Sequence, residues 1–156
     1  MNIPTRLIEF LNNAHVGYEI QHHPVAFTAQ ELAAIEGVKG REHAKVVMVR
    51  ANGHQVMAVL PSDCRLDFEK LGQLTGHKTE LATETDFKAL FPDCEVGTMP
   101  PFGRLYGLET YVDRNLAQNT GIAFEAGTHS DAIKMKYVDY ARLAEAKVAD
   151  FAVKLH

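Results

Sequence analysis

The chain begins with apolar residues at helical spacing, namely Leu7, Phe10, Leu11 and Ala14. They predict an amphipathic helix that ends near Gly17, where glycine can supply a left-handed stop. A short strand over residues 18–21 is expected to follow. Thr28 then precedes Glu31 by three positions, a capping-box spacing that predicts a helix over residues 29–35.

The middle of the chain carries the clearest strand pattern. Residues 44–50 and 55–60 are rich in β-branched and other apolar residues, and Asn52-Gly53 between them tolerates two positive φ angles. The sequence therefore predicts a β-hairpin. Its strands are apolar on both faces apart from Lys45, Arg50 and Gln55, which indicates a central sheet covered on each side.

The remaining pattern predicts short helices and strands. Asp67 is expected to cap a helix that runs to Leu74, and Thr83 to open another that ends near Phe91. Strands are predicted over residues 78–82, 109–113, 122–125 and 132–137, and a closing amphipathic helix is predicted from Leu143, Val148, Phe151 and Leu155. Strict alternation of strand and helix is absent, so the sequence predicts an α+β fold with a mixed sheet.

Composition limits the class of protein. The 156 residues contain no long linker and no internal repeat, so a single domain over residues 1–156 is expected. The longest apolar runs fall far short of the roughly 18 residues that a membrane span requires. Arg6 and Glu9 interrupt the segment where a signal peptide would carry its apolar core. These features predict a cytoplasmic protein that does not engage a membrane.

Charge and motif content exclude several functions. A formal net charge of −4 argues against a protein that coats nucleic acid, although it leaves contact with one RNA end open. Cys64 and Cys94 stand far apart and are expected to be reduced, buried thiols. No phosphate-binding loop, dinucleotide-binding glycine motif, zinc-protease motif or nucleophile elbow occurs, and no histidine has a metal-ligand spacing. No metal or other cofactor is predicted.

Lys45 is the most conspicuous polar residue. It begins an apolar strand and shares a face with Val47 and Val49 by the two-residue period. In one interpretation it is a lysine that snorkels to solvent at a strand end. In the other it is a partly desolvated cation aimed into a cleft, where it holds an ester carbonyl or a phosphate and stabilises oxyanion charge.

Two glycine-containing segments are further candidates. Residues 97–103 place glycines on either side of a Pro-Pro pair, which makes either a stiff connection or a loop whose backbone groups line a pocket. Residues 126–130 form a tight turn between two expected strands. The turn either carries a surface histidine or presents His129 and backbone amides to a ligand.

In these segments the chain resembles the YbaK/prolyl-tRNA-synthetase-associated editing domains, which are free-standing aminoacyl-tRNA deacylases. The resemblance covers about residues 20–145. It rests on the order and spacing of short motifs: His23-Pro24, Ala44-Lys45, Leu66-Asp67, residues 80–84, residues 97–103, residues 111–113 and Ala126-Gly127.

The resemblance implies a mixed, barrel-like β-sheet flanked by helices, and a cleft that receives the aminoacylated 3′ end of a tRNA. It implies that Lys45 is the catalytic residue that contacts the ester, without a protein nucleophile: water, the terminal ribose hydroxyl or the substrate's own side chain attacks. The substrate-binding residues that it implies are Thr28, Val46, Gly97, Thr98, Met99, Pro100, Pro101, Gly127, Thr128 and His129.

The predicted function is therefore trans-editing, the hydrolysis of a mischarged tRNA that carries a small amino acid, with a synthetase or an elongation factor as a further partner. Alanine-specific members carry asparagine after the lysine, where this chain has Val46, so alanine specificity is not implied. One alternative is a non-catalytic module that binds a tRNA end or a synthetase through the basic stretch around Lys39, Arg41 and His43. Another is a small hydrolase of unrelated esters.

Overall fold

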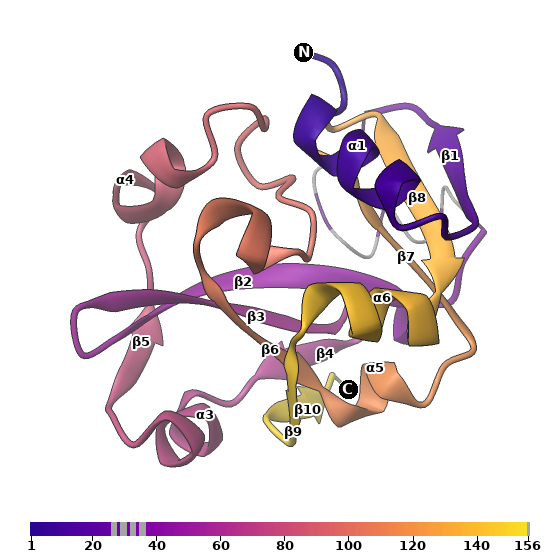
Figure 1. Ribbon diagram of the computed structural model, residues 1–156. Coiled ribbons are helices and arrows are strands. Elements are labelled where there is room, and N and C mark those ends of the chain that lie inside the picture. The colour runs from indigo at the N-terminus through magenta and orange to yellow at the C-terminus, as the bar shows by residue number, and fades with distance from the viewer. Residues whose placement is uncertain (26–27, 29–30, 32–33, 35–36, 156) are drawn as a thin grey trace.

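The structure is a computed structural model that describes residues 1–25, 28, 31, 34 and 37–155 (Figure 1). The helices are α1 (Thr5–Asn13), η1 (Gly40–Glu42), α3 (Phe68–Thr75), α4 (Glu84–Phe87), η2 (Lys88–Leu90), η3 (Gly103–Tyr106), α5 (Arg114–Ala117) and α6 (Tyr137–Ala144). The strands are β1 (Tyr18–His22), β2 (His43–Ala51), β3 (His54–Pro61), β4 (Cys64–Leu66), β5 (Thr79–Leu81), β6 (Glu109–Asp113), β7 (Gly121–Glu125), β8 (Asp131–Lys136), β9 (Lys147–Ala149) and β10 (Ala152–Lys154). No described helix has both the length and the apolar character needed to cross a bilayer.

One large mixed sheet organises the molecule. Its strands follow the order β1-β8-β7-β2-β3-β6-β9, and β5 pairs with β2 beside this path. The pairs β2–β7, β3–β6 and β6–β9 are parallel, and the other pairs are antiparallel. The predicted α+β fold with a mixed sheet flanked by helices is confirmed.

The two faces of the sheet carry separate apolar clusters. The main core lies under α1 and α6, which cover one face in Figure 1, and Phe102 packs edge-on against Phe124 and Tyr140 at its centre. The second core includes Leu71 of α3 and Phe151, which precedes β10. The strands β2 and β3 are therefore covered on both faces, as their apolar pattern predicted.

Local signals placed several elements correctly. The β2–β3 hairpin turns at Asn52 and Gly53, which have φ angles of 51° and 78°. The Asp67 carboxylate accepts bonds from the Glu69 and Lys70 amides at 3.0 and 3.1 Å and caps α3. Thr83 caps α4, which η2 continues to Leu90.

The predicted closing helix is wrong. The helix α6 ends at Ala144, Glu145 adopts a left-handed φ of 50°, and the chain continues as β9 and β10. The Asp113 carboxylate explains the change, because its Oδ1 atom accepts bonds from the Phe151 and Ala152 amides at 2.9 Å each. This contact and the pairing of β10 with β4 hold the segment extended.

Three other differences concern short elements. Strand β4 and helix α5 were not predicted, and β8 ends at Lys136 because Tyr137 starts α6. The predicted helix over residues 29–35 lies largely outside the described residues. Within them, the Glu31 amide donates to Thr28 Oγ1 at 3.0 Å, which is the first half of the expected capping box.

Candidate active site

Strand β2 has an unpaired stretch of edge. It pairs with β3 along its whole length, and its other edge pairs with β7 at His43 and Ala44 and with β5 from Val49 onward. Between these partners, residues 45–47 face no described strand. Backbone groups along this edge are therefore not engaged by a described strand.

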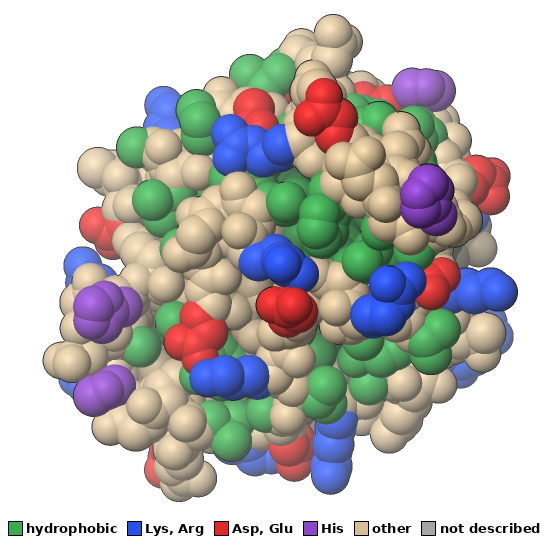
Figure 2. All heavy atoms as spheres, in the orientation of Figure 1, with side chains coloured by type: hydrophobic (Ala, Val, Ile, Leu, Met, Phe, Trp, Pro, Cys, Tyr) green, Lys and Arg blue, Asp and Glu red, His purple; other side chains and the backbone are tan. Residues whose placement is uncertain are grey.

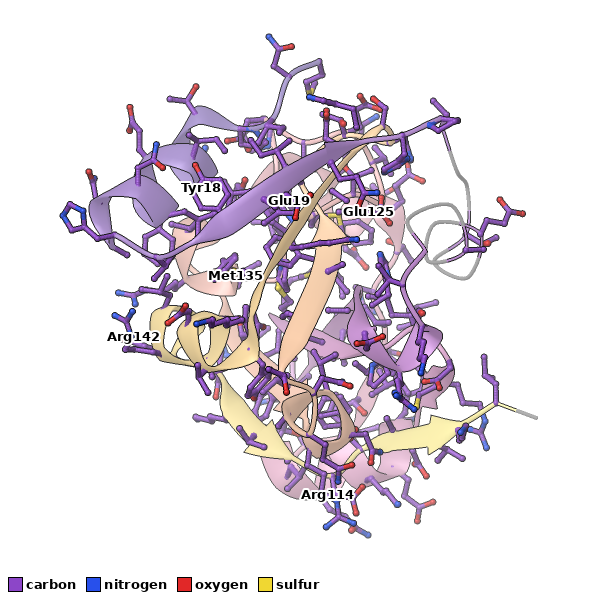
Figure 3. All side chains as sticks on the ribbon, turned by 90° about the vertical axis from the view of Figure 1, so that its right-hand side faces the viewer. Tyr18, Glu19, Arg114, Glu125, Met135 and Arg142 are labelled. Carbon is purple, nitrogen blue, oxygen red and sulfur yellow. The ribbon has the colours of Figure 1, made fainter. Side chains whose placement is uncertain are left out.

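The strands β1, β8, β7 and β2 present polar residues on the face opposite the main core. The register aligns Glu19, Lys134, Ala123 and His43 in one row. The next row contains Gln21, Ala132 and Glu125, and the parallel register with β2 leads from Glu125 to Lys45. We call these eight residues the polar floor. Figure 3 shows Glu125 on the opposite side of the strands from Tyr18 and Met135, which belong to the main-core side.

The middle of the polar floor is shallow. Ala123 and Ala132 are its central residues, and their methyl groups take little space between the longer side chains around them. Both alanines are almost completely buried. The floor therefore has its shortest side chains at its centre, between longer polar side chains, and we call this centre the recess.

His43 lies near both His23 and Lys45, and it is fully buried. Burial is the main cause that lowers the pKa of His43 to about 4, and His23 and Lys45 add to the shift. At neutral pH this imidazole is uncharged, so it can both donate and accept a hydrogen bond.

The polar floor also contains a buried acceptor with no described donor. Gln21 Oε1 is buried and has no described hydrogen-bond partner, and the same holds for Nε2 of the neighbouring His23. Because most buried polar atoms in proteins are paired, unpaired ones indicate a place for a ligand or for water.

Lys45 is a partly buried cation with no partner among the described residues. Its ammonium makes no hydrogen bond or ion pair with any described residue. Burial lowers the pKa of Lys45, against the opposing influence of Cys64 and Asp63. Val49 belongs to the second core and Val47 packs against it, which confirms the face predicted for Lys45. Lys45 thus lies where the second core meets the polar floor.

Neither cysteine provides an activated thiol. Burial raises the pKa of Cys64 to about 11 and that of Cys94 to about 11, so both thiols are protonated at neutral pH. Both are free and buried, as the sequence predicted. A thiolate nucleophile is therefore not available at either position.

The structure joins the two glycine-containing segments. The Gly127 amide donates to the Thr98 carbonyl at 2.9 Å, and the Glu95 amide donates to the Gly127 carbonyl at 2.9 Å. His129 Nε2 lies 3.8 Å from a Glu95 carboxylate oxygen. The loop at residues 97–101 and the turn at residues 126–130 thus form one unit, which we call the loop–turn unit.

Side chains of the loop–turn unit are mostly engaged within the protein. Thr98 Oγ1 donates to the Glu95 carbonyl and Thr128 Oγ1 to the Asp131 carboxylate, each at 2.6 Å. Met99, Pro100 and Pro101 are buried, and the Pro101 carbonyl accepts a bond from the Tyr140 hydroxyl at 2.9 Å.

The other predicted site residues lie in different surroundings. Val46 packs against the main core, which contains Met99 and Ala126, so it lies on the opposite face from Lys45. Thr28 is exposed and accepts the Glu31 amide. Sequence reasoning named His43 only as part of a basic stretch, and it missed Gln21 and Glu125 as site residues. Their only signal is alternation along three separate strands, and it becomes informative only when the register is known.

Two depressions flank the start of β2. The first, the floor pocket, has a volume of about 510 Å³, and Glu19, Ala123 and Lys134 of the polar floor line it together with Gly37 and Val38. The second, the amide pocket, has a volume of about 590 Å³, and its lining includes Arg41, Cys64, Asn115, Gln118 and Lys154. Glu42 and Thr120 line both.

The described residues provide no cluster for a metal. Nowhere in the described part of the chain do three histidine, cysteine, aspartate or glutamate side chains gather as metal ligands would.

Known proteins resemble this chain over most of its length. The sequence profile of the aminoacyl-tRNA editing domain matches residues 23–143. The multifunctional Ser/Thr-tRNA deacylase ProXp-y of Escherichia coli (strain K12) is 26% identical over 152 residues, which cover 94% of this chain and 90% of that protein.

Solved structures share the fold. The crystal structure of the hypothetical protein APE2540 matches with a TM-score of 0.86 and 23% identity, over 95% of this chain and 99% of the other. A candidate trans-editing enzyme for prolyl tRNA synthetase matches with a TM-score of 0.83 and 23% identity, over 97% of this chain and 96% of the other.

Proposed function

The chain belongs to the aminoacyl-tRNA editing domain family, and from this premise we propose that it is a hydrolase that cleaves the ester bond of mischarged tRNA carrying a small amino acid. The observation that carries the proposal is Lys45, a partly buried cation without a described partner at the border of the polar floor. The E. coli relative, named as a Ser/Thr-tRNA deacylase, supports this assignment.

The chemistry follows from charge and position. An aminoacyl ester is already activated, so orientation and stabilisation of the developing oxyanion can supply much of the rate. No carboxylate among the described residues pairs with the Lys45 ammonium and competes for this task. The unpaired edge at residues 45–47 offers backbone amides beside it. Neutral His43 can hold a hydroxyl of the terminal ribose.

The attacking group comes from outside the protein in this proposal. Both thiols are protonated, and the family resemblance leaves water, the ribose hydroxyl or the substrate's own side chain as the nucleophile. Each of these requires the carbonyl to be held in place. That role falls to Lys45 and to the backbone.

The recess of the polar floor fits a small side chain. Ala123 and Ala132 take little space, so a small group fits between their longer neighbours, and Gln21 Oε1 can accept a hydrogen bond from the substrate's ammonium or hydroxyl. An apolar pocket distinguishes one methylene by only about 1–3 kcal/mol, so we expect activity on several small amino acids. The loop–turn unit, with Gly97 and Gly127, supports the end of β7 next to the recess.

The test is deacylation of a panel of tRNAs mischarged with Cys, Ala, Ser, Thr and Pro. We expect wild type to hydrolyse at least one, and Lys45→Ala to lose about 100- to 1000-fold in kcat/KM, as when one oxyanion donor is removed. Lys88→Ala, at an exposed lysine of η2, is the control and should keep wild-type activity. Inactivity of wild type on the whole panel, or full activity of Lys45→Ala, contradicts the proposal.

A binding module of the same fold is the competing function. It would bind uncharged tRNA in a salt-dependent way and deacylate none of the panel. The family match does not favour it, because the family is defined by aminoacyl-tRNA editing.

We also propose that a synthetase or an elongation factor delivers the substrate in the cytoplasm, because a net charge of −4 provides little general affinity for RNA. Addition of either protein should then raise the deacylation rate at low tRNA concentration. An unchanged rate contradicts this part of the proposal.

A further inference from the structure

The amide pocket lies beside the candidate active site and has no role in the mechanism above. The α5 residue Asn115 and the following Gln118 form one side, Arg41 of η1 forms another, and Lys154 of β10 forms a third. Its volume of about 590 Å³ falls within the range of small-molecule sites.

Asn119 Nδ2 at this pocket donates to the Arg41 and Leu116 carbonyls, but four other donor side chains there have no described acceptor. Every arginine except Arg41 and Arg65 pairs with a carboxylate, and Figure 2 shows Lys and Arg side chains lying beside Asp and Glu side chains on the face it presents. By contrast, the side chains of Arg41, Asn115, Gln118 and Lys154 form no hydrogen bond or ion pair with any described residue. Four free donor groups therefore meet at one pocket.

The pocket also holds acceptors. Glu42 and Asp63 contribute carboxylates, of which Glu42 accepts the Lys39 amide at 3.3 Å. Two carboxylates balance the charges of Arg41 and Lys154, so the pocket is not built to neutralise a phosphate. Its mixed donors and acceptors are instead suited to the edge of a base. Cytosine presents an amino donor that a carboxylate accepts and a carbonyl that an amide or a guanidinium can bond.

The position of the pocket connects it to Lys45. Lys154 lies directly opposite Cys64 in the β10–β4 register, and Asp63, which also lines the amide pocket, is a carboxylate whose charge acts on Lys45. Glu42 and Thr120 form the boundary that the amide pocket shares with the floor pocket. An RNA end whose last nucleotide occupies the floor pocket can therefore place the preceding nucleotide in the amide pocket.

We propose that the amide pocket binds the penultimate nucleotide of the tRNA 3′ end, which is a cytidine in the CCA terminus, through base-edge hydrogen bonds. This inference rests on the proposed deacylase function, because that function supplies the esterified terminal nucleotide next to the site. The pocket thereby reads a base shared by all tRNAs and sets the register of the RNA end.

The first test measures binding without catalysis. Uncharged RNA oligonucleotides that end in CCA or in CUA are titrated by fluorescence anisotropy against wild type and Gln118→Ala/Lys154→Ala. We expect wild type to prefer CCA about tenfold, because only cytosine offers an amino group to the carboxylates, and this corresponds to the low end of one bidentate base contact. The double variant lacks donors to the base carbonyl, which cytosine and uracil share, so it should bind both oligonucleotides about tenfold more weakly than wild type. The control is Gln73→Ala/Lys78→Ala, at exposed residues near α3, and should keep the wild-type affinity for both oligonucleotides.

The second test measures where the effect appears in catalysis. In the double variant, KM for charged tRNA should rise about tenfold with unchanged kcat, while kinetics on aminoacyl-adenosine, which lacks the penultimate nucleotide, should not change. Equal binding of CCA and CUA by wild type, or an equal effect on both substrates, overturns the inference. Failure of the deacylase proposal is distinguishable, since it appears as no hydrolysis by wild type whether or not the CCA preference is present.

Discussion

The loop–turn unit and the start of β2 contrast in how their polar groups are satisfied. In the loop–turn unit, the hydroxyls of Thr98 and Thr128 and both backbone groups of Gly127 are hydrogen-bonded. At the start of β2, the Lys45 ammonium has no described partner, and the edge at residues 45–47 pairs with no described strand. Across the polar floor, Gln21 Oε1 of β1 has no described partner either. Unpaired buried groups cost stability. The contrast therefore indicates that the loop–turn unit serves rigidity, whereas the start of β2 is prepared for a ligand.

The largest expected effect on the free energy of unfolding is in the loop–turn unit. Gly127 has a φ of 87°, and a Cβ atom there would lie 2.4 Å from Pro4 Cδ. Gly127→Ala should therefore lower the free energy of unfolding by about 3–4 kcal/mol, from left-handed strain and overpacking together.

Gly97 provides the matched control for this variant. It has a φ of 84°, but no atom lies within 4 Å of the Cβ position, so Gly97→Ala should cost only about 1 kcal/mol. Urea denaturation measures both values. Equal losses in the two variants would show that packing against Pro4 does not hold the turn.

The next largest effect is the pH dependence of stability that the buried His43 at the start of β2 should cause. The pKa of His43 is lowered from 6.5 to about 4 in the folded protein, so the unfolded chain binds more protons between these values. The contribution of His43 to the free energy of unfolding is complete above pH 6.5 and falls as the pH approaches 4, by up to about 3 kcal/mol.

Denaturation curves at pH 7.5 and pH 4.5 test this dependence. His43→Gln should reduce the loss of stability on acidification, whereas His54→Gln, at an exposed position of β3, should leave it unchanged. The same pH dependence in His43→Gln and wild type would refute the burial of an uncharged imidazole.

A smaller effect on the free energy of unfolding is expected where the loop–turn unit contacts the main core. Tyr140→Phe removes the hydroxyl that donates to the Pro101 carbonyl at 2.9 Å. The buried carbonyl then lacks this bond, and the free energy of unfolding should fall by about 1 kcal/mol. No change in the thermal midpoint would indicate that the loop does not depend on this contact.

The smallest effect on stability is expected at the residue with the largest proposed role in catalysis. Burial lowers the pKa of Lys45, so the folded protein disfavours its charged form. Lys45→Met should leave the free energy of unfolding unchanged within about 0.5 kcal/mol or raise it slightly. If denaturation curves show that Lys45→Met lowers the free energy of unfolding by more than about 2 kcal/mol, Lys45 stabilises the fold as the loop–turn unit does, and the contrast between the two regions is wrong.

The sequence predicted elements whose causes are local. The β2–β3 hairpin depends on a turn dipeptide that joins its two strands, and α3 depends on a cap directly before its first residue. Both elements were predicted correctly. The segment after Ala144 was predicted as a helix because its apolar spacing allows one. Its extended form depends on Asp113, which lies 38 residues from Phe151 along the chain.

The candidate site shows the same limit. Lys45 was identified from its own strand, because a lysine interrupts an apolar pattern there. The polar floor was not identified, because Gln21, His43 and Glu125 lie on three strands and share a face only through their register. A single polar residue in each strand gives no sign that the three meet.

Asp113 has a consequence for synthesis of the protein. One carboxylate oxygen accepts the Asn115 amide at the start of α5, and the other accepts the Phe151 and Ala152 amides. The walls of the amide pocket on α5 and on β10 are thus fixed to each other by a single side chain. During translation, this pocket can form only after residues 151–154 have emerged from the ribosome, so the RNA-binding surface is completed later than the hairpin that carries Lys45.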